Sequence, residues 1–321
     1  MPEPIRVAVV GAGAFGRNHL RVLSELPEAK VTAVVDQNAD RAGEAAAQYG
    51  CVASTDIGHL ASLADAAVIA VPTIAHAEVG TALMAQGLDV LIEKPIAPSI
   101  KEADALVSAA TQFGRVLQVG HLERFNPAVL GLQNAITLPL FFEIHRLSLF
   151  TPRSLDVDVV LDLMIHDIDL VLAITGAMPS EIRAAVVSIL SDKVDIANVR
   201  LAFENGCIAN LTASRVSTER IRKLRLFQPR QYISIDYAKQ SGAVITVGGP
   251  AGMAVEQMTV TAAEPLQLQF EAFLNSLKTR EKPKLDGRTA RRTLEVAAAV
   301  LDKINQHAAV VSRTLASGWK P

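Results

Sequence analysis

The sequence is poor in residues that cross-link or stiffen small proteins. Its 321 residues include two cysteines and one tryptophan, and aromatic residues make up 4% of the chain. Cys51 and Cys207 lie far apart and lack metal-ligand spacing, which excludes a disulfide framework and a cysteine metal site. The two thiols are typical of a reducing compartment, and we expect both to be small core residues.

An excess of positive charge is also missing. Lys plus Arg total 31, Asp plus Glu total 33, and the formal net charge is -2. Nucleic acids and acidic membrane faces attract proteins with a clear positive excess, so we expect neither as a partner. The N-terminal apolar run, residues 5–10, is too short for a secretory signal and far below the roughly 20 residues that span a bilayer. We therefore expect a soluble, cytoplasmic protein.

Two different patterns divide the chain, which is too long for one small core. Up to residue 119, short Val- and Ile-rich runs alternate with helical patterns, which predicts a doubly wound parallel sheet covered by helices. Beyond residue 140, longer strand patterns with one strong helix predict an α+β unit with a mostly antiparallel sheet. The predicted fold class is α/β, with domains at 1–119 and 120–321.

The predicted elements follow from these patterns. In the first domain, strands are expected at 5–10, 31–36, 66–71, 89–94 and 116–120, and helices at 15–25, 39–49, 76–86 and 99–113. In the second, strands are expected at 141–147, 182–190, 198–203, 207–214, 223–228, 232–237 and 243–248, and helices at 159–173, 265–279 and 287–306. The last two helices could instead return to pack on the first domain. Asn205-Gly206 predicts a tight hairpin turn. Residues 312–321 are expected to be a loose tail.

A glycine-rich turn follows the first apolar run. The stretch VAVVGAGAFGRNHL places Gly11, Gly13 and Gly16 in G-x-G-x-x-G spacing at the start of a helix. Gly11 allows the tight turn, Gly13 lets the backbone approach a pyrophosphate, and Gly16 permits close helix packing. Phosphate would face the helix N-terminus, at Ala14 and Phe15. The turn predicts a dinucleotide-binding Rossmann domain; the alternative is an ordinary strand-to-helix turn.

The second predicted strand ends at Asp36, 20 residues after the last glycine. At this spacing an acid can accept both ribose hydroxyls, whereas a 2′-phosphate would meet the carboxylate at close range. Gln37 and Asn38 bring no compensating positive charge. NAD is therefore expected as the cofactor, and NADP is less favoured. Arg41 could reverse this preference, and Asp36 could instead be a helix N-cap.

Four stretches in this order resemble the Gfo/Idh/MocA oxidoreductases: GAGAFGRNHL, AVPTIAHAEVGTALMAQGLDVLIEKP, QVGHLERFNPAV and DVVLDLMIHDIDLVL. The resemblance covers nearly the whole chain. It implies a Rossmann domain followed by a domain with a large, open, mostly antiparallel sheet, with the substrate held between them. It also implies that the second domain binds substrate and mediates oligomerisation.

Lys94 directly follows a buried strand pattern and precedes Pro95. It should lie at the carboxyl edge of the parallel sheet, where ligands bind in such folds. Pro95 stops the strand and biases Lys94 toward an extended backbone. An isolated lysine after a strand is usually a solvated residue, so its site role depends on the resemblance.

The resemblance implies further contacts. The expected cofactor residues, besides the glycine turn, Asp36 and Lys94, are Pro72, Thr73, His76 and Glu93. The expected substrate residues are His121, Arg124, Asn126, Arg153 and Asp169. Arg124 could instead form an ion pair between the domains. His19 is expected to pack beside the glycine turn rather than to act in catalysis.

A polar stripe runs along the predicted helix 159–173. At about 100 degrees per residue, Asp162, His166 and Asp169 fall within a narrow arc, whereas Asp167 points elsewhere. The stripe favours a helix that faces a wet cleft. The alternatives are a helix face in bulk water or a core histidine satisfied by a neighbouring carboxylate.

Alcohol oxidation needs hydride transfer to nicotinamide and a base for the hydroxyl proton. Histidine has a reference pKa near 6.5, whereas the lysine value near 10.4 must fall by roughly 3 before lysine is half neutral at pH 7. His166 is therefore assigned as acid/base, oriented by Asp162, and Lys94 as the cation that holds the alcohol oxygen. These roles could be exchanged or shared. No metal is expected, because Asp162 and His166 supply only part of a ligand shell.

Two stretches, VGHLERFNPAV and HRLSLFTPRSLDVDVVLDLMIHDID, most resemble the branch of the family that acts on UDP-linked amino sugars. This implies oxidation of the 3-hydroxyl of UDP-N-acetylglucosamine, before lipid A assembly. Cations available for a diphosphate, unless they form a solvated sheet face, are Arg146, Arg153, Arg215, Arg220 and Arg222. The alternatives are an inositol or free-sugar dehydrogenase and a non-catalytic NAD- or sugar-binding regulator. Since the family commonly buries its open sheet by self-association, a homodimer or homotetramer is expected.

Overall fold

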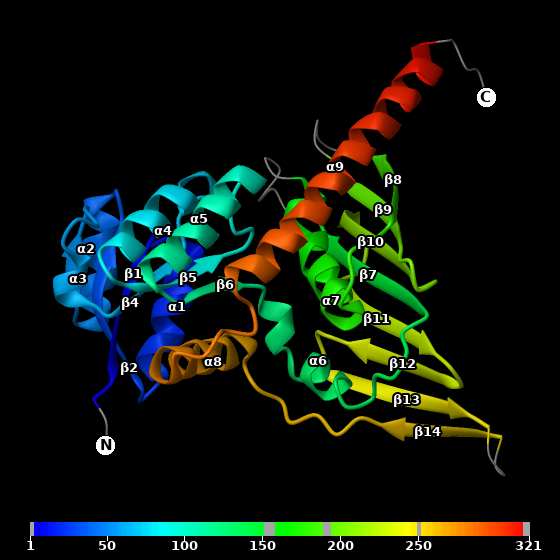
Figure 1. Ribbon diagram of the computed structural model, residues 1–321, viewed down its shortest axis with the longest axis horizontal. Helices are drawn as coiled ribbons and strands as arrows, with labels where there is room; N and C mark the ends of the chain where they lie inside the picture. Colours follow the sequence, from blue (N-terminus) through cyan, green and yellow to red (C-terminus); the bar gives the residue numbers. More distant parts are fainter. Residues whose placement is uncertain (1–2, 151–157, 189–193, 249–251, 317–321) are drawn as a thin grey trace. The chain divides into compact units, whose positions relative to one another are not determined.

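The computed structural model describes residues 3–150, 158–188, 194–248 and 252–316 (Figure 1). The chain forms two compact units: unit 1 comprises residues 1–122 and 263–294, and unit 2 comprises residues 123–262 and 295–321. The chain therefore leaves the first unit close to the expected boundary. It later returns to that unit through residues 263–294, the alternative course for the last predicted helices. Within the described ranges, no helix is both long and apolar enough to cross a membrane.

Unit 1 contains a six-stranded parallel sheet with the strand order β3-β2-β1-β4-β5-β6. The strands are β1 (Ile5–Val10), β2 (Ala29–Val35), β3 (Val52–Ser54), β4 (Ala66–Ile69), β5 (Asp89–Glu93) and β6 (Leu117–Gly120). This is the order of a doubly wound dinucleotide-binding sheet, so the predicted fold is confirmed. The order reverses between β1 and β4, and ligands of such sheets bind beside this switch point, at the carboxyl ends of the strands.

Four helices of unit 1 lie close to their predicted positions, and two short ones, at residues 60–63 and 73–75, were not predicted. They are α1 (Ala14–Glu25), α2 (Ala39–Tyr49), α3 (Leu60–Leu63), η1 (Thr73–Ala75), α4 (His76–Ala85) and α5 (Ile100–Phe113). Asn38 caps α2 by accepting a hydrogen bond from the Arg41 amide, and Ser99 caps α5 in the same way. Gly50 and Gly114 end these two helices in the left-handed conformation. The capping signals in the sequence thus account for both helix boundaries.

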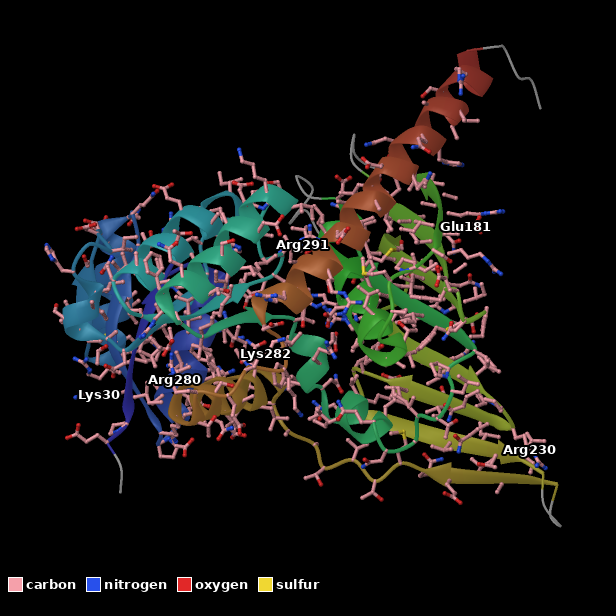
Figure 2. The ribbon with its side chains drawn as sticks, viewed as in Figure 1. Lys30, Glu181, Arg230, Arg280, Lys282 and Arg291 are labelled. Carbon is pink, nitrogen blue, oxygen red and sulfur yellow. The ribbon has the colours of Figure 1, made fainter. Side chains whose placement is uncertain are left out.

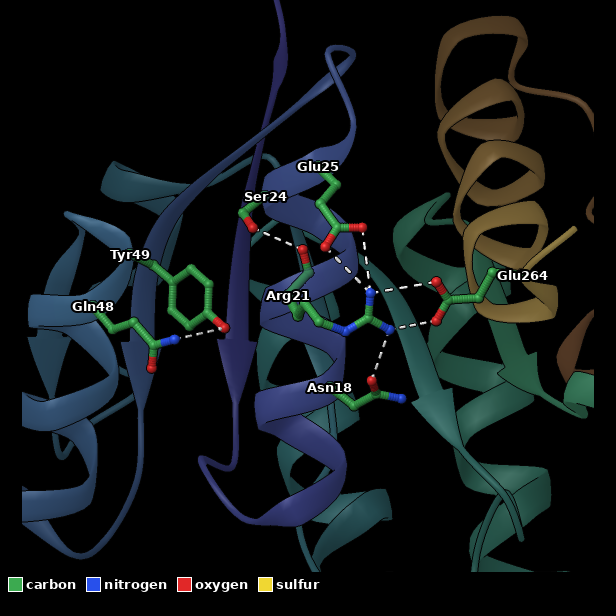
Figure 3. A network of polar contacts seen from close by, with 7 residues as sticks. All are labelled: Asn18, Arg21, Ser24, Glu25, Gln48, Tyr49 and Glu264. Carbon is green, nitrogen blue, oxygen red and sulfur yellow. Dashed lines mark hydrogen bonds and ion pairs between the residues drawn. The ribbon is translucent and has the colours of Figure 1, made fainter.

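Helix α8 (Pro265–Thr279) completes the core of unit 1, although it follows the second sheet in sequence. Its apolar side chains in this core are Leu266, Phe270, Phe273, Leu274 and Leu277. Polar contacts hold both ends of the helix. Before it, Glu264 accepts hydrogen bonds from Arg21 of α1 (Figure 3). After it comes Arg280, labelled in Figure 2. Its Nη1 lies 2.5 Å from Asp89 Oδ2 at the start of β5.

Unit 2 contains an eight-stranded sheet with the order β14-β13-β12-β11-β7-β10-β9-β8. The strands are β7 (Phe141–Leu149), β8 (Glu181–Val187), β9 (Ile196–Ala202), β10 (Ile208–Ser217), β11 (Ile221–Gln228), β12 (Gln231–Asp236), β13 (Ser241–Val247) and β14 (Met253–Gln257). Every neighbouring pair is antiparallel except β7 with β10. The mostly antiparallel sheet is therefore confirmed, and Gly206, at φ +84°, makes the predicted turn between β9 and β10.

The helices of unit 2 differ more from the prediction. They are η2 (Leu122–Phe125), α6 (Pro127–Leu132), η3 (Val160–Met164), α7 (Ile165–Thr175) and the unit 2 part of α9 (Gly287–Ala316). The helix expected at 159–173 begins as a π-helical turn, η3, before α7 continues in α geometry. Helix α9 extends to Ala316, so the expectation of a loose tail is wrong for residues 312–316.

The two cysteines have different surroundings. Cys207 is fully buried beside the hairpin turn, and burial raises the pKa of its thiol to about 11. Cys51 is partly exposed, just before the short strand β3. The expectation of a core cysteine is thus confirmed for Cys207, whereas Cys51 packs against the core of unit 1 and is only partly buried.

Candidate active site

The glycine turn lies between β1 and α1. Gly11 has φ +101°, and a Cβ there would lie 2.5 Å from the carbonyl oxygen of Ala70. A Cβ at Gly16 would lie 1.7 Å from the carbonyl oxygen of Gly11, so close packing requires glycine at both positions. A Cβ at Gly13 would meet nothing within 4 Å. Gly13 is also the N-cap of α1 and provides no side-chain cap, which leaves amides at the helix N-terminus for an anion. This geometry fits a pyrophosphate.

Asp36 fastens the end of β2 to the glycine turn. Its Oδ2 accepts a hydrogen bond from the Ala12 amide and its Oδ1 from the Asn38 amide, both at 2.8 Å. Asn38, rather than Asp36, caps α2. Each carboxylate oxygen retains acceptor capacity for a ribose hydroxyl. The side chains of Ala14 and Phe15 are exposed at the start of α1, with Phe15 67% exposed.

The residues after β4 include three cofactor candidates. Pro72 is exposed and Thr73 is partly exposed, whereas His76 is 1% exposed. The two ring nitrogens of His76 lie 3.0 Å from the carbonyl oxygens of Val71 and Pro95. Burial lowers the pKa of His76, and a neutral imidazole donates to one of the two carbonyls. His76 therefore connects the loops after β4 and β5 and does not present its ring to solvent.

Glu93 and Lys94 mark the carboxyl end of β5. Glu93 Oε1 lies 2.8 Å from His19 Nε2, and Glu93 Oε2 accepts a hydrogen bond from the Lys94 amide at 3.2 Å. Burial acts to raise the pKa of Glu93, but the hydrogen bond and charge of His19 and the charge of Lys94 outweigh it, and the pKa lies below its ordinary value. Lys94 is partly exposed, and its bond to Pro95 is cis. The expected packing role of His19 therefore includes a hydrogen bond that anchors Glu93.

The three residues of the polar stripe in unit 2 differ in their exposure to solvent. Asp162 and His166 are partly exposed, although Met164, Ile165 and residues 167–172 are buried. Asp169 is 1% exposed, and its Oδ2 lies 2.8 Å from Arg124 Nε. Asp162 lies in the π-helical turn, where the spacing of 100 degrees per residue does not hold. The structure therefore leaves Asp162 and His166 accessible on one segment and uses Asp169 in an internal ion pair.

Two of the remaining substrate candidates, His121 and Asn126, are buried, and Arg124 is partly exposed. His121 is 1% exposed, at the end of β6. Asn126 is 4% exposed; it caps α6 through the Ala128 amide at 3.1 Å and donates to the carbonyl of Tyr237 at 3.1 Å. Arg124 pairs with Asp169 inside unit 2, not between domains. Arg153 lies outside the described residues.

A buried ion cluster in unit 2 was not expected from the sequence. Arg146 on β7 is 2% exposed, and its guanidinium donates to both carboxylate oxygens of Asp167 at 2.8 and 2.7 Å. It also donates to Glu123 Oε1 at 2.8 Å, and it lies 5.5 Å from the ring centre of Tyr237. Burial opposes the Arg146 charge, but Asp167 and Glu123 outweigh it and keep the pKa of Arg146 above its ordinary value.

A sequence signal for this cluster exists. In the run FFEIHRL, Arg146 shares the parity of Phe142 and Ile144, which are both fully buried. Alternation therefore predicts that Arg146 points into the core, and it removes this residue from the cations available to a ligand. Within the described ranges, no three His, Cys, Asp or Glu side chains gather as a metal site.

Comparison with known proteins extends these observations. Residues 5–121 match an oxidoreductase family with an NAD-binding Rossmann fold, and residues 145–233 match the GFO/IDH/MocA C-terminal domain. The UDP-N-acetylglucosamine 3-dehydrogenase of Acidithiobacillus ferrooxidans is 37% identical over 302 residues, which cover 92% of this chain and 96% of that protein. An inositol 2-dehydrogenase of an Arthrobacter species is 28% identical over 226 residues, 66% of this chain and 67% of that protein.

A solved structure of the Acidithiobacillus ferrooxidans enzyme has a TM-score of 0.91 with this chain at 36% identity. The match covers 95% of this chain and 99% of that one. A second crystal form of the same enzyme gives a TM-score of 0.90. Sequence similarity and fold therefore agree over almost the whole length, and the chain belongs to the Gfo/Idh/MocA family of NAD-binding oxidoreductases.

Proposed function

We propose that the protein is an NAD-dependent dehydrogenase that oxidises the 3-hydroxyl of UDP-N-acetylglucosamine to a ketone. The observation that carries this proposal is the 37% identity to the enzyme of that name over 92% of this chain and 96% of the relative. The inositol 2-dehydrogenase named above is 28% identical over about two thirds of each chain. The nucleotide sugar is therefore the favoured substrate, and inositol is the second candidate.

NAD, held by the glycine turn and Asp36, would supply the acceptor for the hydride that leaves the carbon bearing the hydroxyl. The His166 imidazole takes the proton from the hydroxyl oxygen, because histidine titrates near the working pH and this ring is partly exposed among buried neighbours. Asp162 orients the imidazole from the adjoining π-helical turn. The Lys94 ammonium neutralises the negative charge that develops on the same oxygen. The competing assignment makes Lys94 the base.

The choice of NAD over NADP is part of the proposal. Asp36 already accepts two backbone amides, and its remaining lone pairs suit ribose hydroxyls. A 2′-phosphate would add negative charge beside this carboxylate. Dissociation constants for the two cofactors test this choice, and tighter binding of NADP would contradict it.

Self-association through the open face of the unit 2 sheet is also proposed. A row of apolar side chains crosses neighbouring strands on that face: Ile208, Phe141, Phe227, Tyr232, Ile245 and Val255. Phe227 stacks on Tyr232 with ring centroids 4.8 Å apart and is still 37% exposed. Burial of this row in a homodimer or homotetramer would remove apolar area from water. Sedimentation of Phe227→Asp should then show smaller species than wild type.

The decisive experiment follows NADH formation by absorbance with UDP-N-acetylglucosamine, other UDP-sugars, free N-acetylglucosamine and myo-inositol. We expect turnover with UDP-N-acetylglucosamine and a 3-keto product by mass spectrometry and NMR. Turnover of inositol alone would support the second candidate. Tight NAD binding without turnover of any substrate would support a non-catalytic regulator.

Because both cysteines are free, the enzyme is proposed to work in a reducing, cytoplasmic setting.

A further inference from the structure

The structure separates the arginines that could meet an anionic ligand. Arg146 is committed to Asp167 and Glu123 inside unit 2. Arg215 is 8% exposed and donates to the carbonyl of Val194 at 3.1 Å. These two cations serve the fold. Among the arginines of β11 and the turn before it, Arg222 is partly exposed and Arg220 is exposed.

The sheet register brings Arg222 next to Arg146. Arg222 pairs with Arg146 across β11 and β7, and the Tyr237 amide donates to the Arg222 carbonyl at 2.9 Å. Directly opposed residues on neighbouring strands have Cβ atoms about 4.5–5.5 Å apart, and like charges in such positions are destabilising. Two guanidinium groups side by side therefore require negative charge nearby.

The carboxylates of unit 2 meet this requirement only in part. Asp167 uses both oxygens on Arg146, and Glu123 Oε1 lies 2.8 Å from Arg146 Nη1 but 3.9 Å from Arg222 Nη1. The charged groups that act on Arg222 are Arg146, Arg220, Glu123 and Asp167. Together with Arg222 itself, these are three positive and two negative groups, so Glu123 and Asp167 do not balance the three arginines.

Two donors at this corner also lack acceptors. Within the described part of the chain, the buried Nε of Arg222 has no hydrogen-bond partner. The hydroxyl of Tyr237, a residue only 3% exposed, has none either. Burial and the neighbouring Arg146 charge lower the pKa of Arg222, so an anion at this position would stabilise its positive charge. Buried donors without partners are rare in folded proteins, so an acceptor from a ligand would be stabilised at this position.

We propose that Arg222 binds the diphosphate of the nucleotide-sugar substrate. The inference rests on the proposed function for the identity of the ligand. An arginine fork donates two parallel hydrogen bonds to phosphate oxygens, and a diphosphate carries the negative charge that this corner lacks. Arg220, two residues earlier and exposed, adds a second positive charge on the solvent side. A free sugar or an inositol has no group of this kind, so Arg222 would select nucleotide sugars over both.

The test compares Arg222→Met with Arg225→Met. Both residues lie on β11, but Arg225 lies on the opposite face and pairs with Glu143 at 2.9 Å. Arg222→Met should raise KM for UDP-N-acetylglucosamine about 10- to 100-fold, the range expected for hydrogen bonds to a charged group. KM for NAD should stay within about 2-fold, and Arg225→Met should resemble wild type in both constants. Arg222→Lys should fall between, because lysine keeps the charge and loses the fork.

Thermal unfolding with and without UDP provides a readout that does not depend on turnover. UDP should raise the Tm of wild type and of Arg225→Met, and it should raise that of Arg222→Met much less. Without UDP, Arg222→Met should unfold at the wild-type temperature or higher, because a repulsion with Arg146 is removed. A lower Tm with an unchanged KM would assign Arg222 a structural role and overturn the inference.

The outcomes also separate this inference from the proposed function. If UDP stabilises wild type through Arg222 but no UDP-sugar is oxidised, the proposed function fails and the diphosphate site stands. If UDP-N-acetylglucosamine is oxidised and Arg222→Met keeps the wild-type KM, the function stands and the inference fails. If neither UDP nor inorganic pyrophosphate changes the Tm of wild type, the inference also fails.

Discussion

The two units hold their candidate site residues by different means. In unit 1, backbone groups position most of the candidate residues. Asp36 accepts hydrogen bonds from two backbone amides, and His76 lies between two backbone carbonyls. A Cβ at Gly13 would meet no atom within 4 Å. In unit 2, His166 follows a π-helical turn and precedes Asp167, which is locked into a buried ion cluster. A backbone cradle is complete before any ligand binds, whereas a cluster of buried charges depends on each partner. Mutations should therefore affect the two units differently.

The largest effect is expected from His166→Ala. This change removes the proposed acid/base from unit 2 and leaves the glycine turn and Asp36 of unit 1 intact. Loss of a general acid or base lowers kcat by about 10²- to 10⁴-fold. NAD affinity, measured by fluorescence titration, should stay near the wild-type value. The pH profile of kcat should also lose the limb that belongs to histidine. A variant with wild-type kcat and an unchanged profile would transfer the role of base to Lys94.

The next effect concerns the buried cluster of unit 2. Asp167→Asn should lower the free energy of unfolding by about 3–5 kcal/mol, because it leaves Arg146 charged and buried with a weaker partner. The double variant Arg146→Met, Asp167→Leu should lose much less, since it removes both charges together. Urea unfolding measures both values. The surface pair of Arg225 and Glu143 is the control, and Glu143→Gln should change stability by less than about 1 kcal/mol. Equal losses in the single and double variants would contradict this account.

In unit 1, substitutions at Gly13 and Gly16 should have different effects: one on NAD binding, the other on the stability of the fold. Gly16→Ala places a Cβ against the Gly11 carbonyl and should lower the free energy of unfolding by about 1–3 kcal/mol. Gly13→Ala meets no protein atom within 4 Å and should leave the Tm unchanged while it weakens NAD binding about 10-fold or more. Thermal unfolding and NAD titration of both variants provide the comparison. Normal NAD affinity in Gly13→Ala would argue against a pyrophosphate at this turn.

The smallest expected effect is a pH dependence of the free energy of unfolding, caused by Glu93 in unit 1. Its pKa in the folded protein lies below the ordinary value of 4.5, so the unfolded chain takes up a proton first as pH falls. The resulting stabilisation is fully present above pH 4.5 and is lost as pH falls through the lower, folded-state pKa. Urea unfolding of wild type and Glu93→Gln between pH 7 and pH 3 should show their difference shrinking below about pH 4.5. A difference that stays constant with pH would exclude an ionised, His19-anchored Glu93.

The sequence predicts unit 1 well because its signals are local. The run at 5–10, the glycine spacing and the capping residue Ser99 each act within a few neighbours, and the strands and helices lie where these signals put them. The three-residue strand β3 is missed because Val52 and Ala53 are both exposed and form no apolar run. Lys94 at the end of β5 follows from the same local logic.

Unit 2 and the course of the chain are predicted less well because they depend on distant contacts. The π-helical turn at Val160–Met164 has no signature in the local sequence. It changes the direction in which the Asp162 side chain would point from a uniform α-helix. The strand β14 is exposed along its whole length, so no alternation marks it. The burial of Asn126 and Asp169 arises from Tyr237 and Arg124, residues that only the folded unit brings together.

The late position of α8 in the sequence has a consequence for biosynthesis. Five apolar side chains of the nucleotide-binding core come from residues 266–277, so a ribosome must finish most of the chain before that core can close. Until then, a nascent fragment that ends near residue 122 exposes the apolar surface that α8 later covers. Pulse-labelled truncations should therefore resist proteolysis only once residue 294 has left the exit tunnel.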